Sequence, residues 1–207
     1  MPGTNLTRAE AEERAALINV RSYEVELDLS DAATSDTFRS HTVVRFDAKP
    51  GAETFIDLIS PYVHSIVLNG VAMDPAWQHV DSRIALYDLQ EHNELTVTAD
   101  MAYSNTGEGL HKFTDPEDGE TYLYSQFEVA DTRRVYAVFE QPDLKATFQF
   151  TVTAPRHWHV ISNSPSLPIA VGSLACPSAE GHRRAAPPTH PPTCPPPTRP
   201  PGHQHTT

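Results

Sequence analysis

Two side chains near the middle of the chain have the types and the spacing to bind a cation. Glu128 follows Gln126 by two residues on a stretch that reads as extended chain. At the period of two of a β-strand, both side chains leave the same face. A carboxylate aimed into a closed cleft holds a protonated amine by a charge-assisted hydrogen bond worth roughly 1.5–3 kcal/mol. The alternative is that Glu128 is an ordinary solvated strand carboxylate.

The residues around this pair follow a recognisable order. The segment from Tyr124 to Phe150 contains Ser-Gln-Phe-Glu, then Asp-x-Arg-Arg, then Phe-Glu-Gln-Pro-Asp-Leu-Lys. This order resembles the N-terminal domain of bacterial aminopeptidase N, a zinc aminopeptidase of the gluzincin type. The resemblance covers about residues 1–165. It implies that Glu128 anchors the amine of a peptide's N-terminus and that Gln126 lines the pocket for the first side chain.

The sequence departs from this family at one stretch and lacks its catalytic motifs. After the two arginines it reads Val-Tyr-Ala-Val-Phe-Glu-Gln-Pro, where the family often has Phe-Pro-Cys-Phe-Asp-Glu-Pro, so that Glu140 and Gln141 could alter a structural hydrogen bond. None of the eleven histidines belongs to a His-Glu-x-x-His motif, which binds zinc on one helical face. Gly-x-Met-Glu-Asn is absent too. We therefore expect no zinc to be bound by this chain and no useful hydrolysis by it alone.

Composition restricts the partners and the location. The formal net charge of −12 disfavours nucleic acids and anionic membranes, both of which require a basic face. No apolar run approaches the ~18–20 residues of a membrane span, and the first residues have no apolar signal core. The only cysteines, Cys176 and Cys194, lie near the C-terminus. We expect a cytoplasmic protein that binds neither nucleic acid nor membranes.

The body of the chain is expected to be mainly β, an antiparallel saddle-shaped sheet or sandwich after one short helix. Thr7 and Glu10 are spaced as a capping box before a helix-forming run from Arg8 to Leu17. Alternating apolar residues then predict successive strands. Their expected positions are residues 23–29, 38–46, 53–59, 63–68, 71–73, 83–86, 95–103, 148–152 and 158–160, the last around Trp158 and Val160.

Two turns and one loop punctuate these strands. Asn69-Gly70 is a strong hairpin signal because it supplies positive φ angles. Asp118-Gly119 predicts a second hairpin, which leads to Gln126. The preceding loop, 105–111, contains two glycines, but no Lys-Ser/Thr follows, so it is no phosphate loop. The resemblance implies a Gly-x-Gly loop at this place, just before the hairpin that leads to the cleft.

The composition changes after about Pro165. Residues 166–207 hold 11 of the 19 prolines and no aromatic residue. Such a stretch cannot bury enough apolar surface to order itself, so we expect a disordered tail of polyproline II character. The division is thus a domain over 1–165 and a tail over 166–207. Because it begins where the family's chain continues, we interpret the tail as a possible frameshift product, with a genuine proline-rich extension as the alternative.

Other residues that could do chemistry have simpler interpretations. Arg133 and Arg134 could clamp an anion, but pairing with Asp131 or Glu140 to fix the loop is favoured. His157 and His159 would share a strand face, yet no third metal ligand is apparent. His190, Cys194, His203 and His205 lie in the tail without ligand spacing. Asp115, Glu117, Asp118 and Glu120 lack the spacing of a calcium loop and are interpreted as a solvated hairpin tip.

Three functional hypotheses remain open. The first is the amine-recognising N-terminal domain of a zinc aminopeptidase, separated from its catalytic partner and inactive alone. The second is a stand-alone β-sandwich module that binds peptides or another protein without catalysis. The third is a non-functional fragment. A separated domain is expected to expose an apolar patch and to associate or bind apolar dyes, whereas an evolved module is expected to stay monomeric.

Overall fold

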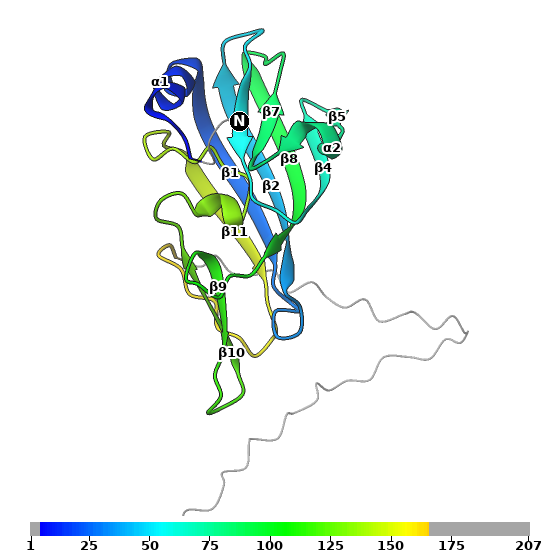
Figure 1. The fold of residues 1–207 in the computed structure, drawn as a ribbon, viewed down its shortest axis with the longest axis vertical. Helices are drawn as coiled ribbons and strands as arrows, with labels where there is room; N and C mark the ends of the chain where they lie inside the picture. Colours follow the sequence, from blue (N-terminus) through cyan, green and yellow to red (C-terminus); the bar gives the residue numbers. More distant parts are fainter. Residues whose placement is uncertain (1–4, 166–207) are drawn as a thin grey trace, which may run out of the picture. The chain divides into compact units, whose positions relative to one another are not determined.

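The computed structural model describes residues 5–165, a β-rich body that follows one helix (Figure 1). Helix α1 (Arg8–Leu17) begins with the predicted capping box: the Thr7 hydroxyl accepts the N–H of Glu10 at 3.3 Å, and the Glu10 carboxylate accepts the N–H of Thr7 at 2.8 Å. Two backbone donors that a helix start leaves unpaired are thereby satisfied. The predicted helix is confirmed.

Three sheets make up the body. The six-stranded sheet has the order β11 (Thr147–Thr153), β1 (Ile18–Asp28), β2 (Thr37–Ala48), β8 (His92–Ala102), β4 (Tyr62–Leu68) and β5 (Val71–Met73). The three-stranded sheet has the order β3 (Thr54–Asp57), β7 (Arg83–Leu86) and β6 (His79–Val80). A hairpin joins β9 (Gly109–Thr114) to β10 (Thr121–Gln126). The short helices are α2 (Pro75–Gln78) and η1 (Thr132–Arg134).

The long strands of the six-stranded sheet alternate as their sequences predict. Val25, Val44 and Leu95 are buried on the inner face. On the outer face Arg45 pairs with the carboxylates of Glu24 and Glu94 on the two neighbouring strands. Because side chains of a strand alternate between faces, one apolar and one charged face follow from a period of two. The mainly β fold class is confirmed.

The predicted turn between β4 and β5 is present. Asn69 and Gly70 have φ angles of 53° and 79°. Positive φ at both central residues is the geometry of the tight hairpin turn whose twist matches the flanking strands. β4 and β5 pair antiparallel across it.

Two expectations for the C-terminal part of the body are wrong. β11 runs parallel to β1, from Ser22 opposite Thr147 to Asp28 opposite Thr153. Because a long crossover separates β11 from the hairpin, the strand returns beside β1 in the same direction, and an antiparallel arrangement is not required. Around Trp158 and Val160 there is no strand. The N–H of Trp158 bonds the carbonyl of Pro155 at 2.9 Å, so a turn occupies this segment.

The crossover forms a second layer against the sheet. Val135 to Phe139 are five consecutive buried residues. Val138 and Asp57 exchange two backbone hydrogen bonds of 2.9 and 3.1 Å, which ties the crossover to β3. The Phe139 ring meets the Phe46 ring edge-on at 5.2 Å between centroids. One continuous apolar core therefore joins the inner face of the six-stranded sheet to β3, β7 and the crossover.

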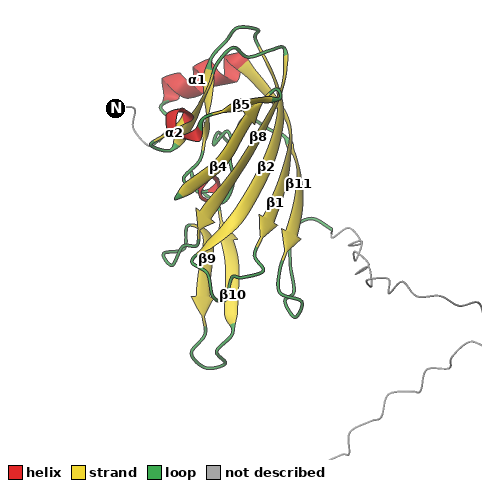
Figure 2. Ribbon diagram, turned by 90° about the vertical axis from the view of Figure 1, so that its right-hand side faces the viewer, coloured by secondary structure: helices red, strands yellow, loops and turns green. Residues whose placement is uncertain are grey.

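Among residues 5–165 no helix is long and apolar enough to cross a membrane. The predicted proline-rich tail, 166–207, lies outside the described residues, and so do its cysteines and histidines. Figure 2 shows β11 at one side of the six-stranded sheet and β5 at the other, with the β9–β10 hairpin projecting from one end.

Candidate functional site

The predicted site lies where the β9–β10 hairpin ends. β10 pairs with β9 from Thr121 opposite Thr114 to Gln126 opposite Gly109. The Tyr124 and His111 rings, which face each other in this register, stack at 4.6 Å. Leu110 is buried and Leu123 packs partly against the core, so the hairpin is attached to the body at the end that carries Gln126.

Gln126 and Glu128 are adjacent, but they do not share a strand face as the sequence predicts. Gln126 is the last residue of β10, and Glu128 lies in the turn that follows. The ladder of paired residues ends with Gln126 opposite Gly109, the first residue of β9. The Gln126 side-chain oxygen accepts the backbone N–H of Glu128 at 2.9 Å. The peptide bond between Val129 and Ala130 is cis.

The Glu128 carboxylate is exposed and makes no hydrogen bond or ion pair within residues 5–165. It is therefore available to a cation from outside the described part of the chain. Since the Gln126 oxygen is engaged by the backbone of Glu128, its amide group offers donors rather than an acceptor. Together the two side chains present one anionic acceptor beside one neutral donor.

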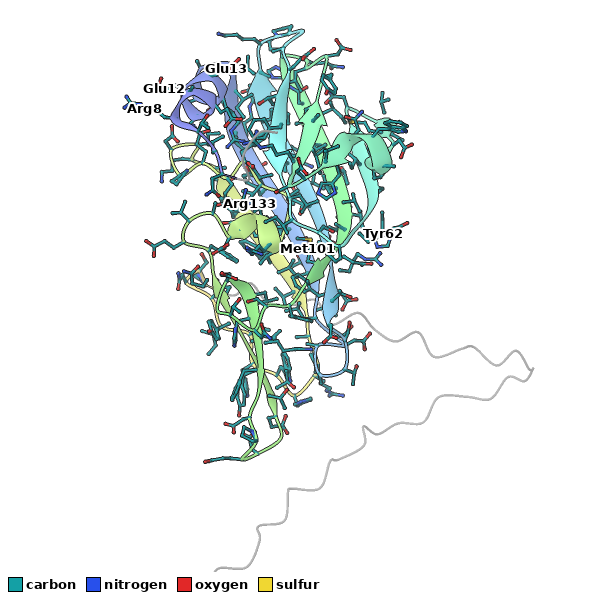
Figure 3. The ribbon with its side chains drawn as sticks, viewed as in Figure 1. Arg8, Glu12, Glu13, Tyr62, Met101 and Arg133 are labelled. Carbon is teal, nitrogen blue, oxygen red and sulfur yellow. The ribbon has the colours of Figure 1, made fainter. Side chains whose placement is uncertain are left out.

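The turn that carries Glu128 is held from behind by Arg133. The guanidinium of this buried residue donates from Nε to the carbonyl of Ala130 at 2.9 Å, two residues beyond Glu128. Its backbone N–H donates to Oε2 of Glu140 at 2.8 Å. Figure 3 shows Arg133 at the short helix between the hairpin and the main sheet. Burial raises the pKa of Glu140, and the hydrogen bond from Arg133 opposes that rise.

The expectation that the two arginines fix the loop is confirmed in these contacts. Arg134 pairs through Nε with Asp131 Oδ1 at 2.9 Å. Arg133 uses its backbone for Glu140 and its side chain for Ala130 and for Asn5, at 3.3 Å to Oδ1 of the latter. With both guanidinium groups engaged by the chain itself, we assign them a structural role and not an anion clamp.

A buried polar network that the sequence did not predict lies behind Glu140. Arg14 of α1, 2% exposed, donates to Asp57 Oδ2 at 2.9 Å and to Gln141 Oε1 at 2.9 Å. Asp57 Oδ2 also accepts the backbone N–H of Glu140 at 3.1 Å. Arg14 stands three residues from Ala11 and from Leu17, so it belongs to the apolar face of the helix. A charged residue on the apolar face of a helix is the sequence feature from which this burial could have been predicted.

Glu140 and Gln141, the two residues that depart from the family's usual Asp-Glu, both take part in structural hydrogen bonds. The Gln141 amide reaches back to α1, donating to the carbonyl of Ala11 at 2.9 Å and accepting from Arg14. The guanidinium of Arg14 lies 4.8 Å from the centroid of the Phe55 ring. The guanidinium of Arg14 can be buried because it is paired with the Asp57 carboxylate and lies over the Phe55 ring.

The glycine-containing loop packs against the same region. Gly107 and Gly109 have φ angles of 98° and 63°, and a Cβ on Gly109 would stand 2.9 Å from the Cβ of Arg134. The N–H of Gly107 donates to Nδ1 of His111 at 3.0 Å. The loop precedes the hairpin as expected. A cavity of about 180 Å³ lies beside it, lined by Tyr103, Glu108 and Arg134 among others, and neither Gln126 nor Glu128 lines it.

No group of three His, Cys, Asp or Glu side chains in residues 5–165 could hold a metal ion. The described residues therefore do not fit a zinc site, and we derive no step through a metal. His157 comes no closer than 3.9 Å to Glu120, and it lies outside any strand.

The acidic hairpin tip is exposed. Asp118 accepts hydrogen bonds from the N–H of Glu120 and from the Tyr122 hydroxyl, and these bonds lower the pKa of Asp118.

Comparison with known proteins places these features in context. The profile of the family described as Peptidase M1 N-terminal domain matches residues 19–170. Aminopeptidase N of Streptomyces lividans is 62% identical over 168 residues, which are 80% of this chain and 20% of that protein. Human aminopeptidase Q is 28% identical over 118 residues, 53% of this chain and 12% of that protein. The chain thus spans about a fifth or less of the length of these relatives.

Solved structures show the same fold. Native yeast LTA4 hydrolase matches with a TM-score of 0.57 at 16% identity, over 68% of this chain and 23% of that one. Aminopeptidase A of Legionella pneumophila, solved in complex with aspartic acid, matches with a TM-score of 0.53 at 15% identity, over 65% and 16% respectively.

Proposed function

The chain belongs to the M1 peptidases as their N-terminal domain, and from this premise we propose that it supplies the amine-recognising wall of an aminopeptidase site. Glu128 accepts the protonated α-amine of a peptide, and Gln126 borders the pocket for the first side chain. The observation that carries the proposal is the Glu128 carboxylate, which is exposed, unpaired within residues 5–165 and held in a braced turn.

The chemistry of bond cleavage belongs elsewhere in this proposal. M1 aminopeptidases are zinc enzymes, and a zinc ion supplies the activated water in peptide hydrolysis. The described residues offer no ligand set for it. The chain's own part is to bind and orient the amine, which fixes the peptide's first residue relative to a catalytic partner. We include a cytoplasmic location in the proposal, on the cysteine usage of the sequence.

The test is a graft. The residues of this chain that align with Streptomyces lividans aminopeptidase N replace their counterparts in that enzyme, with which they share 62% identity. In the graft, Glu128→Gln is expected to lower kcat/KM for an aminoacyl anilide by about ten- to a hundredfold, the equivalent of one charge-assisted hydrogen bond. Glu117→Gln, at the exposed hairpin tip, is the matched control and leaves kcat/KM unchanged.

If kcat/KM is the same for Glu128→Gln and for the unchanged graft, Glu128 does not bind the substrate amine. A loss shared by Glu117→Gln would assign the effect to net charge and not to a contact with the amine. Circular dichroism of each graft shows that the N-terminal domain is folded.

A stand-alone peptide-binding module is the second candidate, and one observation favours it. Phe113, Tyr122 and Tyr124 on the hairpin are each about half exposed; Tyr124 lies two residues before Gln126, and Phe113 pairs with Tyr122 nearer the hairpin tip. Aromatic side chains of this kind are typical of binding surfaces. If the full chain alone binds a peptide with a free amino end and not its acetylated form, the module is favoured. Binding that requires the graft favours the aminopeptidase wall.

A further inference from the structure

One dipeptide of the chain has the chemistry for a spontaneous covalent modification. Asn69-Gly70, which forms the turn between β4 and β5, is the only Asn-Gly sequence in the chain. The backbone nitrogen of a glycine can attack the side-chain carbonyl carbon of a preceding asparagine, because glycine has no side chain to obstruct the approach. The other asparagines precede residues that carry side chains: Leu6, Val20, Glu94, Thr106 and Ser164. Asn69 is therefore the asparagine at which this attack is least hindered.

The attack leads to deamidation of Asn69. The Gly70 nitrogen forms a bond to Cγ of Asn69 and loses its proton, while the bond from Cγ to Nδ2 breaks and ammonia leaves. Water then opens the cyclic imide. Attack of water at Cγ gives aspartate, whereas attack at the main-chain carbonyl carbon gives isoaspartate, in which the main chain continues through Cγ. In total one water is consumed and one ammonia is released, so the reaction requires no oxidant, reductant or cofactor.

The fold fixes the side chain that must react. Oδ1 of Asn69 accepts the N–H of Glu94 at 2.9 Å, and Nδ2 of Asn69 donates to Oδ1 of Asn93 at 3.0 Å. Both partners belong to β8, which pairs with β4 up to the turn. Because both ends of the amide are bonded to β8, Cγ turns toward the Gly70 nitrogen only after one of these bonds breaks. The closed turn is therefore expected to react slowly, although Gly70 is exposed.

Asn93 is a well-anchored partner for the Asn69 amide. It is 5% exposed, its Nδ2 donates to the carbonyl of Gln90 at 2.7 Å, and its Oδ1 accepts the N–H of Gln90 at 2.9 Å. An amide oxygen only accepts hydrogen bonds, so Oδ1 of Asn93 can bind the amide of Asn69 but not a carboxylate. Once Asn69 has become aspartate or isoaspartate, the bond to Asn93 cannot form again.

We propose that Asn69 is a deamidation site gated by its bond to Asn93, slow while the β4–β5 turn is closed and reactive when the turn opens. β5 is a three-residue edge strand, so local opening here costs less than global unfolding. The step is one-way, because isoaspartate also adds a carbon to a two-residue turn whose length sets the register of β4 and β5. The site is independent of the proposed amine site, since Gln126 and Glu128 take no part in it.

Peptide mapping by mass spectrometry tests the proposal, because replacement of the amide NH₂ by OH changes the mass of the peptide that contains Asn69. The full chain is incubated at neutral pH beside a synthetic peptide of residues 64–74. We expect Asn69 to deamidate in the folded chain about tenfold or more slowly than in the peptide. In urea, the full chain is expected to react at the rate of the peptide.

Asn93→Ala removes the acceptor of the Asn69 amide. It is expected to speed deamidation of the folded chain by about two- to tenfold, the effect of one lost hydrogen bond on the opening of the turn. Asn105→Ala, at an exposed asparagine outside this network, is the matched control and leaves the rate unchanged.

A measurement on the wild-type chain guards against a misfolded variant. The N–H of Asn69 donates to the carbonyl of Glu94 at 2.9 Å, so its hydrogen exchange reports opening of the turn. As urea is added below the unfolding transition, the exchange rate of this N–H and the deamidation rate of Asn69 are expected to rise in parallel.

Three results would overturn the proposal. The first is deamidation of Asn69 in the folded chain at the rate of the peptide, because the turn then provides no gate. The second is an unchanged rate in a folded Asn93→Ala chain, or a rate in the wild-type chain that does not follow the exchange of the Asn69 N–H. The third is modification of another asparagine ahead of Asn69 in urea.

Discussion

The six-stranded sheet and the turn after β10 are built on different principles. In the sheet, side chains alternate, and charged residues on the outer face pair with opposite charges on the next strand, as Arg45 does with Glu24 and Glu94. In the turn, Glu128 has no charged partner among the described residues, and its position depends on Arg133, which bonds the carbonyl of Ala130 from behind. The sheet is stabilised by many similar cross-strand contacts, whereas the position of the turn depends on a few individual hydrogen bonds.

Removal of one side chain should affect the stability of the fold differently on the exposed outer face and in the buried network behind the turn. Exposed ion pairs contribute little, because each charge remains solvated when its partner is lost. Buried pairs contribute through the charge that their loss would leave unpaired. The network Arg14–Asp57, which supports Glu140 and through it Arg133, belongs to the second class.

Arg14→Ala gives the largest expected effect. It leaves the Asp57 carboxylate buried without its cation, so we expect a loss of about 3–5 kcal/mol in the free energy of unfolding, measured by urea denaturation. The matched control is Arg45→Ala on the outer face, for which the loss should stay within about 1 kcal/mol. Equal losses for the two variants would remove the distinction between the buried network and the outer face.

Gly109→Ala gives an intermediate effect. The new Cβ would stand 2.9 Å from the Cβ of Arg134, at a φ of 63°. We expect a loss of about 1–3 kcal/mol in urea denaturation, since both the close contact and the backbone strain oppose the change. Gly51→Ala is the control, because its φ is 75° and nothing lies within 4 Å of its added Cβ. A loss no greater than that of the control would show that the loop does not pack tightly on Arg134.

The smallest effect concerns pH and the helix. Hydrogen bonds from Arg83 and from the N–H of Thr7 lower the pKa of Glu10 from 4.5 to about 2. A carboxylate whose pKa is lower in the folded state stabilises fully above pH 4.5, and its contribution is lost as the pH falls toward about 2. We expect Glu10→Gln to flatten the fall of Tm over this range. Glu13→Gln, on the same helix but with no ion pair to Arg83 among residues 5–165, should not.

Local patterns predicted most of the fold because each depends on neighbours in sequence. The capping box of Thr7 and Glu10, the Asn69-Gly70 turn and the alternation of β1, β2 and β8 are of this kind. The parallel placement of β11 could not be predicted from its own seven residues, since it depends on the path of the crossover. The strand expected around Trp158 failed because a turn uses its N–H group.

The roles of Glu128 and Gln126 stay a prediction, and the strand geometry expected for the two residues is wrong. Glu128 and Gln126 were selected from their types and surroundings, but β10 ends at Gln126, opposite Gly109 of a different segment, so Glu128 falls in the turn that follows. Arg14 and Asp57 are 43 residues apart and meet only in the folded chain. Contacts over such separations leave no periodic trace in the sequence.

The most direct test of the account compares two inhibitors that differ only in the amine. In the graft with the Streptomyces lividans enzyme, inhibition constants are measured for a dipeptide and for its des-amino analogue, before and after Glu128→Gln. The account predicts that the substitution raises the inhibition constant of the dipeptide by about ten- to a hundredfold and leaves that of the des-amino analogue unchanged. An equal weakening of both inhibitors, or of neither, would contradict the contact between Glu128 and the substrate amine.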